Sequence, residues 1–169
     1  MRLKEKCWSY LGVIPMFLFG VVLHFMYGWS GNQFVVGLLA PVNESIWEHL
    51  KLSLIPLIIW WGSYMLINRD VDKNKWLLGL LISIITSMIF IVAFYYTYTG
   101  AFGIELSILD ISSLFFGLWL GQYLAMHVYK LDIFVKWYIS VGVLLLIVSL
   151  FIVFTVNAPN LPLFMINNS

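Results

Sequence analysis

Charged residues are scarce in this chain of 169 residues. Asp, Glu, Lys and Arg make up 10% of it and hydrophobic residues 62%, whereas an ordinary soluble domain is about a quarter charged. This scarcity excludes a water-soluble globular domain. The net charge of +1 comes with basic residues spread over short segments, which argues against a nucleic-acid-binding patch or arm.

The chain has one cysteine, and its hydrophobic start lacks the cleavage site of a signal peptide. Cys7 is the single cysteine, so an intramolecular disulfide cannot form. A basic N-terminus precedes a hydrophobic run, as in a signal peptide. The run covers residues 7–27, which is longer than a signal-peptide core, and no small-x-small site follows it. We expect this segment to remain as a membrane helix.

Five hydrophobic segments are long enough to cross a bilayer. A helix needs about 20 mainly apolar residues to span about 30 Å of hydrocarbon. The segments that meet this requirement are 8–29, 44–67, 76–98, 105–129 and 136–156. We therefore predict an all-α integral membrane protein with a bundle of about five transmembrane helices, in a single domain over residues 1–169.

The basic residues fall on one side of this layout. Apart from Lys51, each Lys or Arg lies before or at the edge of the first segment, between the second and third, or around the turn between the fourth and fifth. These eight residues are Arg2, Lys4, Lys6, Arg69, Lys73, Lys75, Lys130 and Lys136. Because cytoplasmic loops carry an excess of Lys and Arg, we expect the N-terminus inside and the C-terminus outside.

The start of the second segment combines a helix cap with unexplained polar residues. Ser45 and Glu48 have the spacing of a capping box, in which each side chain bonds a free N–H of the first turn. Capping does not explain His49, or Lys51, which lies about 10 Å deeper than Glu44 at 1.5 Å per residue. Ionisable groups inside a membrane cost several kcal/mol, so they are functional candidates.

Two other helices place ionisable residues at a similar depth. Asp110 begins a face of small residues that continues through Gly117, and His24 lies between Gly20 and Gly28. Small residues mark faces where helices approach closely, so both side chains should point into the bundle. Each also has a purely structural interpretation: His24 as a core histidine, and Asp110 as an interhelix partner of Lys51 or of a tyrosine.

We expect these residues to meet in one cavity near the outer face. The candidates for acid–base catalysis are Glu48, His49 and Asp110, and the candidates for ligand binding are His24, Asn43, Glu44, Lys51 and Tyr98. Acidic residues outnumber basic ones in the outer half, which favours a cationic ligand. No metal site is predicted, because Glu48 beside His49 lacks the paired histidines of a zinc-protease helix. The sequence identifies no cofactor.

The stretch Pro41-Val42-Asn43-Glu44-Ser45-Ile46-Trp47-Glu48-His49-Leu50-Lys51-Leu52 resembles a family of small, uncharacterised multipass membrane proteins of Gram-positive bacteria. The likeness extends over most of the chain, through Leu23-His24-Phe25-Met26-Tyr27, Tyr96-Thr97-Tyr98-Thr99-Gly100 and Pro162-Leu163-Phe164. Members often have Pro-Pro-His in the tail, where this chain has Ala158-Pro159-Asn160. The resemblance implies a multipass protein of the bacterial cytoplasmic membrane and supplies no activity.

The sequence is compatible with three functions. The first is a binding or catalytic site for a lipid headgroup or small polar solute at the outer face. The second is a non-enzymatic membrane subunit, immunity or assembly factor. The third is a small proton- or cation-linked transporter, against which the lack of an internal repeat counts. The lipid bilayer is the one partner that the sequence implies directly.

Overall fold

Long apolar runs favour helices, because a helix pairs its own backbone N–H and C=O groups in hydrogen bonds. The computed structural model describes residues 3–131 and 133–165, and it is 79% helix with no strand among these residues. Its elements are α1 (Leu3–Leu11), α2 (Val13–Trp29), α3 (Phe34–Gly37), α4 (Ile46–His49), α5 (Lys51–Ile67), α6 (Lys73–Phe102), α7 (Ser107–Lys130), α8 (Trp137–Val156) and the 3₁₀ helix η1 (Pro162–Phe164).

Five helical segments of the described chain are long and apolar enough to cross a membrane. They are Lys4–Trp29, formed by α1 and α2, Ile46–Ile67, formed by α4 and α5, and the single helices Lys73–Phe102, Ser107–Lys130 and Trp137–Val156. Each corresponds to one of the five predicted segments. The largest difference is α6, which extends beyond the predicted 76–98 at both ends.

Local capping explains the longer α6. At its start, the Asp72 side chain accepts hydrogen bonds from the backbone N–H groups of Asn74 and Lys75, so the helix begins before the apolar run. At its end, Gly103 adopts a left-handed conformation with φ of 69°, and its N–H bonds to the carbonyl of Thr99. Glycine takes this conformation without a Cβ clash, so the helix stops there.

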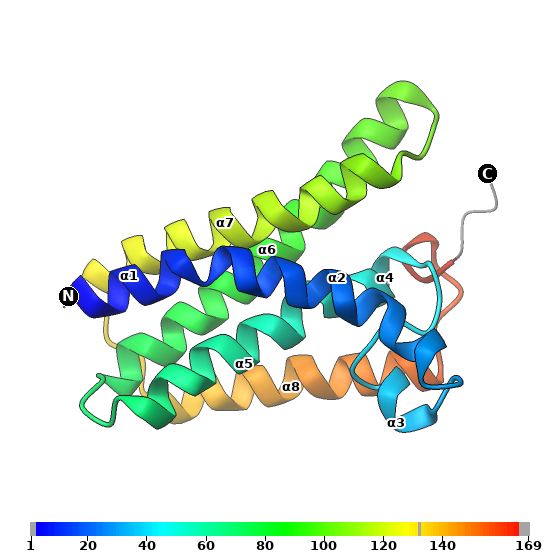
Figure 1. Cartoon of the computed structure of the whole chain (residues 1–169). Coiled ribbons are helices and arrows are strands. Elements are labelled where there is room, and N and C mark those ends of the chain that lie inside the picture. The colour runs from blue at the N-terminus through cyan, green and yellow to red at the C-terminus, as the bar shows by residue number, and fades with distance from the viewer. Residues whose placement is uncertain (1–2, 132, 166–169) are drawn as a thin grey trace.

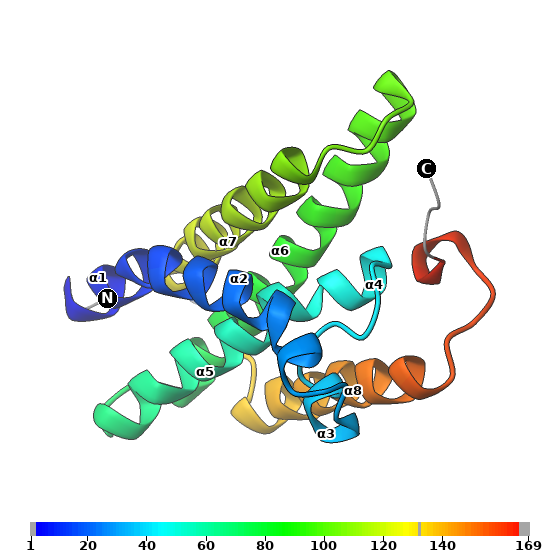
Figure 2. The ribbon, with the colours of Figure 1, turned by 45° about the vertical axis from the view of Figure 1, so that its right-hand side comes forward.

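The bundle has two distinct ends. The start of α1, the α5–α6 turn, the end of α7 and the start of α8 lie together at the left of Figure 1, whereas α3, α4, η1 and the α6–α7 turn lie toward the right. We call the first the basic end, since the described Lys and Arg residues other than Lys51 belong to its helix ends and turns. We call the second the cavity end. Figure 2 shows the far part of the α6–α7 hairpin leaning away from α4.

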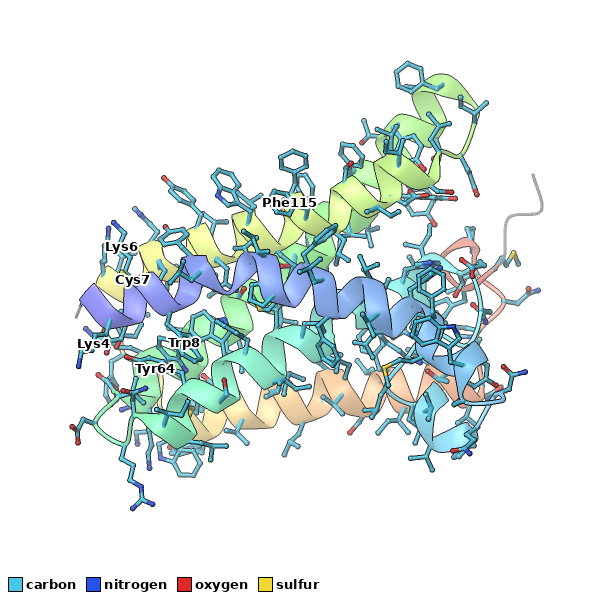
Figure 3. The ribbon with its side chains drawn as sticks, in the orientation of Figure 1. Lys4, Lys6, Cys7, Trp8, Tyr64 and Phe115 are labelled. Atoms are coloured by element: carbon cyan, nitrogen blue, oxygen red, sulfur yellow. The ribbon has the colours of Figure 1, made fainter. Side chains whose placement is uncertain are left out.

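Tryptophans fix the helices to one another at the basic end. Trp8 and Trp60 stack with ring centroids 4.6 Å apart, and each indole N–H donates to the other residue's backbone carbonyl, at 3.2 and 3.1 Å. Tyr64 lies beside Trp8, as Figure 3 shows. A Cβ at Gly12 would fall within 2.1 Å of the Trp60 ring, so the glycine lets α1 and α2 pass α5 closely.

Small residues bring α6 and α7 into contact. The Ser87 hydroxyl donates to the carbonyl of Gly117, on the other helix, at 2.9 Å. A Cβ at Gly121 would lie 2.6 Å from the carbonyl oxygen of Ser83. This is the close packing that the small-residue faces predict. Gly28 differs, since no described atom outside its own stretch of helix lies within 4 Å of the position its Cβ would take.

Candidate binding cavity

The chain before α4 is shaped by its own polar side chains. The N–H of Ser45 donates to Asn43 Oδ1 at 2.9 Å, a turn that asparagine forms readily. Ser45 then caps α4, because its hydroxyl accepts from the N–H of Glu48 at 3.4 Å. Only this half of the predicted capping box forms. The Glu48 carboxylate bonds elsewhere, so the interpretation of Glu48 as a reciprocal cap is wrong.

Glu48 and Lys51 form a buried ion pair. Lys51 Nζ lies 2.6 Å from Glu48 Oε2, and the two residues are 0% and 2% exposed, respectively. Lys51 also donates to the carbonyls of Gly37 at 2.8 Å and Ala40 at 3.4 Å, so it has three acceptors for its three protons.

The carboxylate of this pair is also fully engaged. Glu48 Oε2 accepts from the N–H of Val42 at 3.0 Å, and Oε1 accepts from the Thr155 hydroxyl, in α8, at 2.9 Å. The ion pair therefore joins the loop after α3, the start of α5 and α8. Neither Glu48 nor Lys51 lines the cavity described next.

A cavity of about 550 Å³ lies between α2, α4, α5, α6, α7 and the residue after η1. Its polar lining comes from α2, α4, α6 and α7 and from the loops before α4 and α7. The polar residues are His24, Glu44, His49, Tyr95, Glu105, Ser107, Asp110 and Ser113. Its apolar lining includes Val21, Leu52 and Ile91. The cavity is thus amphipathic, and among the described residues that line it three carry carboxylates and none is Lys or Arg.

His24, Glu44 and His49 form a cluster within the cavity lining. His49 Nε2 lies 3.3 Å from Glu44 Oε2, and the imidazole rings of His49 and His24 are 5.2 Å apart between centroids. His49 Nδ1 lies 2.9 Å from the carbonyl oxygen of Ser45. The hydrogen bond from His49 holds the pKa of the Glu44 carboxyl below its ordinary value.

This cluster differs from the one expected from helical spacing. The predicted segment 44–67 would place Glu44 one turn before Glu48, on the same helix face. Instead α4 begins at Ile46, and Glu44 precedes the N-cap. Because Glu44 lies outside the helix, its side chain contacts His49, five residues later, and does not lie on the same helix face as Glu48.

Asp110 is held by a tyrosine of the neighbouring helix. The Tyr98 hydroxyl donates to Asp110 Oδ1 at 2.6 Å and accepts from the N–H of Leu106 at 3.4 Å. Nearby, the Tyr95 hydroxyl donates to Glu105 Oε1. These contacts connect the ends of α6 and α7 and fix two carboxylates at the cavity lining.

The sequence-predicted residues separate into two groups. His24, Glu44, His49 and Asp110 line the cavity. Four others lie beside it and hold the surrounding structure: Asn43, Glu48, Lys51 and Tyr98. The cavity also includes Glu105 and Tyr95, which the sequence analysis did not select as site residues. The available signals were the position of Glu105 shortly before Asp110 in sequence and that of Tyr95 among the tyrosines near the end of α6.

The donor set of the cluster suits a metal ion. His24, Glu44 and His49 each offer one ligand atom, and these atoms lie within 4.8 Å of one another. Two imidazoles and a carboxylate are ligands that bind divalent transition metals such as zinc. Asp110 and Glu105 add negative charge to the same cavity, so the arrangement favours a cation of either inorganic or organic kind.

Comparison with known proteins assigns the chain to a family without assigning a function. No curated protein and no solved structure matches it. A family model matches residues 1–168, nearly the whole length, in agreement with the resemblance seen in the sequence. The chain therefore belongs to DUF6512, a family of unknown function.

Proposed function

We propose that this protein is a multipass protein of the bacterial cytoplasmic membrane that binds an amphipathic ligand with a cationic head in its outward-facing cavity. The topology is supported by the basic end, which the positive-inside rule assigns to the cytoplasm. The cavity then lies toward the outer leaflet, with the N-terminus inside and the C-terminus outside.

The observation that carries the ligand assignment is the composition of the cavity lining. Glu44, Glu105 and Asp110 supply three carboxylates, and the lining formed by residues 3–131 and 133–165 includes no Lys or Arg. Val21 and Leu52 contribute an apolar surface to the same space. A molecule with an amine-bearing head and a hydrocarbon portion, such as a lipid, complements both parts of this lining.

The residues around the cavity have different roles in this proposal. Asp110, oriented by Tyr98, and Glu105, oriented by Tyr95, attract the cationic head. Glu48 and Lys51 hold the surrounding frame, since their polar atoms are already bonded to one another and to the backbone. Any acid–base chemistry on a bound ligand would fall to groups that line the cavity, namely His49 and Asp110.

Binding can be measured with the protein in lipid nanodiscs, using octyltrimethylammonium as the probe. Octyl sulfonate has the same chain and the opposite charge, and empty nanodiscs report simple partitioning into lipid. We expect saturable binding of the cationic probe to the protein. Asp110→Asn should weaken it about tenfold, which corresponds to about 1.4 kcal/mol. Asp70→Asn, a matched loss of a carboxylate outside the cavity lining, should leave it unchanged.

Two results would contradict the proposal. One is equal binding of the cationic and sulfonate probes, which would remove the role of the carboxylates. The other is unchanged binding by an Asp110→Asn protein whose melting temperature matches that of the wild type.

A further inference from the structure

The spacing of ligand atoms in the His24–Glu44–His49 cluster is close to that of a metal site. Zinc binds nitrogen and carboxylate oxygen at about 2.0–2.2 Å, so tetrahedral ligand atoms lie about 3.3–3.5 Å apart. His49 Nε2 and Glu44 Oε2 are already 3.3 Å apart. One ligand atom each from His24, Glu44 and His49 lies within 4.8 Å of the other two, so a side-chain adjustment of about 1 Å completes the triangle.

His49 is oriented as metal-binding histidines usually are. The carbonyl oxygen of Ser45 can only accept a hydrogen bond, so His49 Nδ1, 2.9 Å away, carries the proton. This contact turns Nε2 toward the Glu44 carboxylate, and a bound metal ion would replace the proton that Nε2 shares with Glu44. A ligating histidine commonly donates its other N–H to a backbone carbonyl, which fixes both tautomer and ring orientation.

His24 provides an independent observation. Its Nδ1 is buried and has no hydrogen-bond partner among the described residues. A buried polar atom is nearly always bonded, so an unpartnered one at a cavity requires an explanation. The ring contacts of His24 with Phe25 and His49 supply no hydrogen bond to this nitrogen among the described residues.

We propose that His24, Glu44 and His49 bind one divalent transition metal ion, of the zinc class, and leave a coordination position open toward the cavity. All three residues line the cavity, so the site rests on the function proposed above and deepens it. Two imidazole ligands favour zinc over calcium or magnesium, which prefer oxygen. Three protein ligands with one open position is the pattern of zinc sites that act on a bound molecule.

Metal binding can be tested on purified, tag-free protein in nanodiscs after treatment with a chelator. Titration with Zn²⁺, and with Co²⁺ as a visible-absorbing substitute, should reveal one site per chain. His24→Ala and His49→Ala should each lower the affinity by at least about tenfold, since even outer-shell changes have effects of this size. The matched control is His127→Ala, which removes the remaining histidine, an exposed residue of α7.

Glu44→Gln covers the case in which a histidine variant fails to fold. The Glu44 side chain is 69% exposed, so its amide should be accommodated, yet it removes the anionic ligand. Stoichiometric metal that is lost in the three cluster variants and kept in His127→Ala supports the site. The absence of stoichiometric metal in the wild type, or equal loss in His127→Ala, overturns it.

The metal site and the proposed ligand binding fail separately. If chelator-treated protein binds octyltrimethylammonium and needs Asp110 to do so, while no metal binds, only the metal site is wrong. If metal binds with the expected variant pattern while the amphiphile does not bind, the ligand assignment is wrong and the metal site stands.

Discussion

Glu48 and Lys51 show how a charged pair is accommodated in an apolar bundle. An unpaired charge in such surroundings costs several kcal/mol, but here the ammonium has three acceptors and the carboxylate three donors. The pair contributes to stability mainly by avoiding the large penalty that either partner would incur alone. Its bonds to Val42 and Thr155 also fix the loop and helix next to the cavity.

The first prediction concerns this pair. Lys51→Met should lower the free energy of unfolding by about 3 kcal/mol or more, because it leaves the Glu48 carboxylate buried without a cation. Lys73→Met, a change at an exposed position, should have little effect. Adding Glu48→Gln to Lys51→Met should recover part of the loss. Thermal unfolding in detergent measures all three, and equal melting temperatures for Lys51→Met and Lys73→Met would refute the structural role.

Tyr98 holds Asp110 at the side of the cavity formed by α6 and α7, and its loss should have a smaller effect on stability. Tyr98→Phe removes the hydroxyl that bonds Asp110 and the N–H of Leu106. We expect a loss of about 1 kcal/mol in stability together with weaker binding of the cationic probe, since Asp110 is no longer held in place. Tyr96→Phe is the control, because Tyr96 lies on the same helix and is 42% exposed. Full binding by Tyr98→Phe would mean that Asp110 needs no positioning.

Small residues allow α6 and α7 to pack closely against each other in the α6–α7 hairpin. Gly121→Ala places a Cβ 2.6 Å from the Ser83 carbonyl oxygen and from the Ser87 hydroxyl. Because backbone must move to relieve this contact, we expect a loss of about 1–3 kcal/mol. The Cβ of Gly142→Ala, in α8, would meet no described atom beyond its own stretch of helix within 4 Å, so this variant should be neutral or stabilising. Comparable melting temperatures for the two variants would contradict this packing.

The helices themselves were predictable, whereas part of the site was not. An apolar run of sufficient length has few alternatives to a helix, so the five segments follow from composition. The meeting of His24 and Asp110 with the region around His49 could be anticipated from depth along each helix. The contact between Glu44 and His49 could not, because it depends on α4 starting at Ile46. The three-way bonding of Lys51 was equally hidden, since the carbonyls of Gly37 and Ala40 approach it only through the fold of the loop.

At the scale of the whole molecule, the two ends of the bundle differ in charge and in openness. The basic end is packed by tryptophans, and nearby a buried network joins α1, α6 and α7 through Ser9, Gln122 and Ser83. The cavity end holds the acidic lining. This difference suits a protein that is anchored at the inner surface and accessible from the outer one.

Orientation can be tested with single cysteines in a Cys7→Ser background. Lys73→Cys lies at the basic end and Asn160→Cys in the tail after α8, both at exposed positions. A membrane-impermeant thiol reagent applied to intact cells should label Asn160→Cys, and should label Lys73→Cys only after the cells are opened. The reverse pattern would place the cavity on the cytoplasmic side.

One labelling experiment can show whether the cavity is accessible from outside and whether it holds the proposed ligand. Ser107 is exposed and lines the cavity, so Ser107→Cys in the same background should react with the impermeant reagent on intact cells. Octyltrimethylammonium at saturation should slow this reaction and leave that of Asn160→Cys unchanged. Labelling of Ser107→Cys only in opened cells, or at a rate that the cationic probe does not alter, would contradict an outward-facing binding cavity.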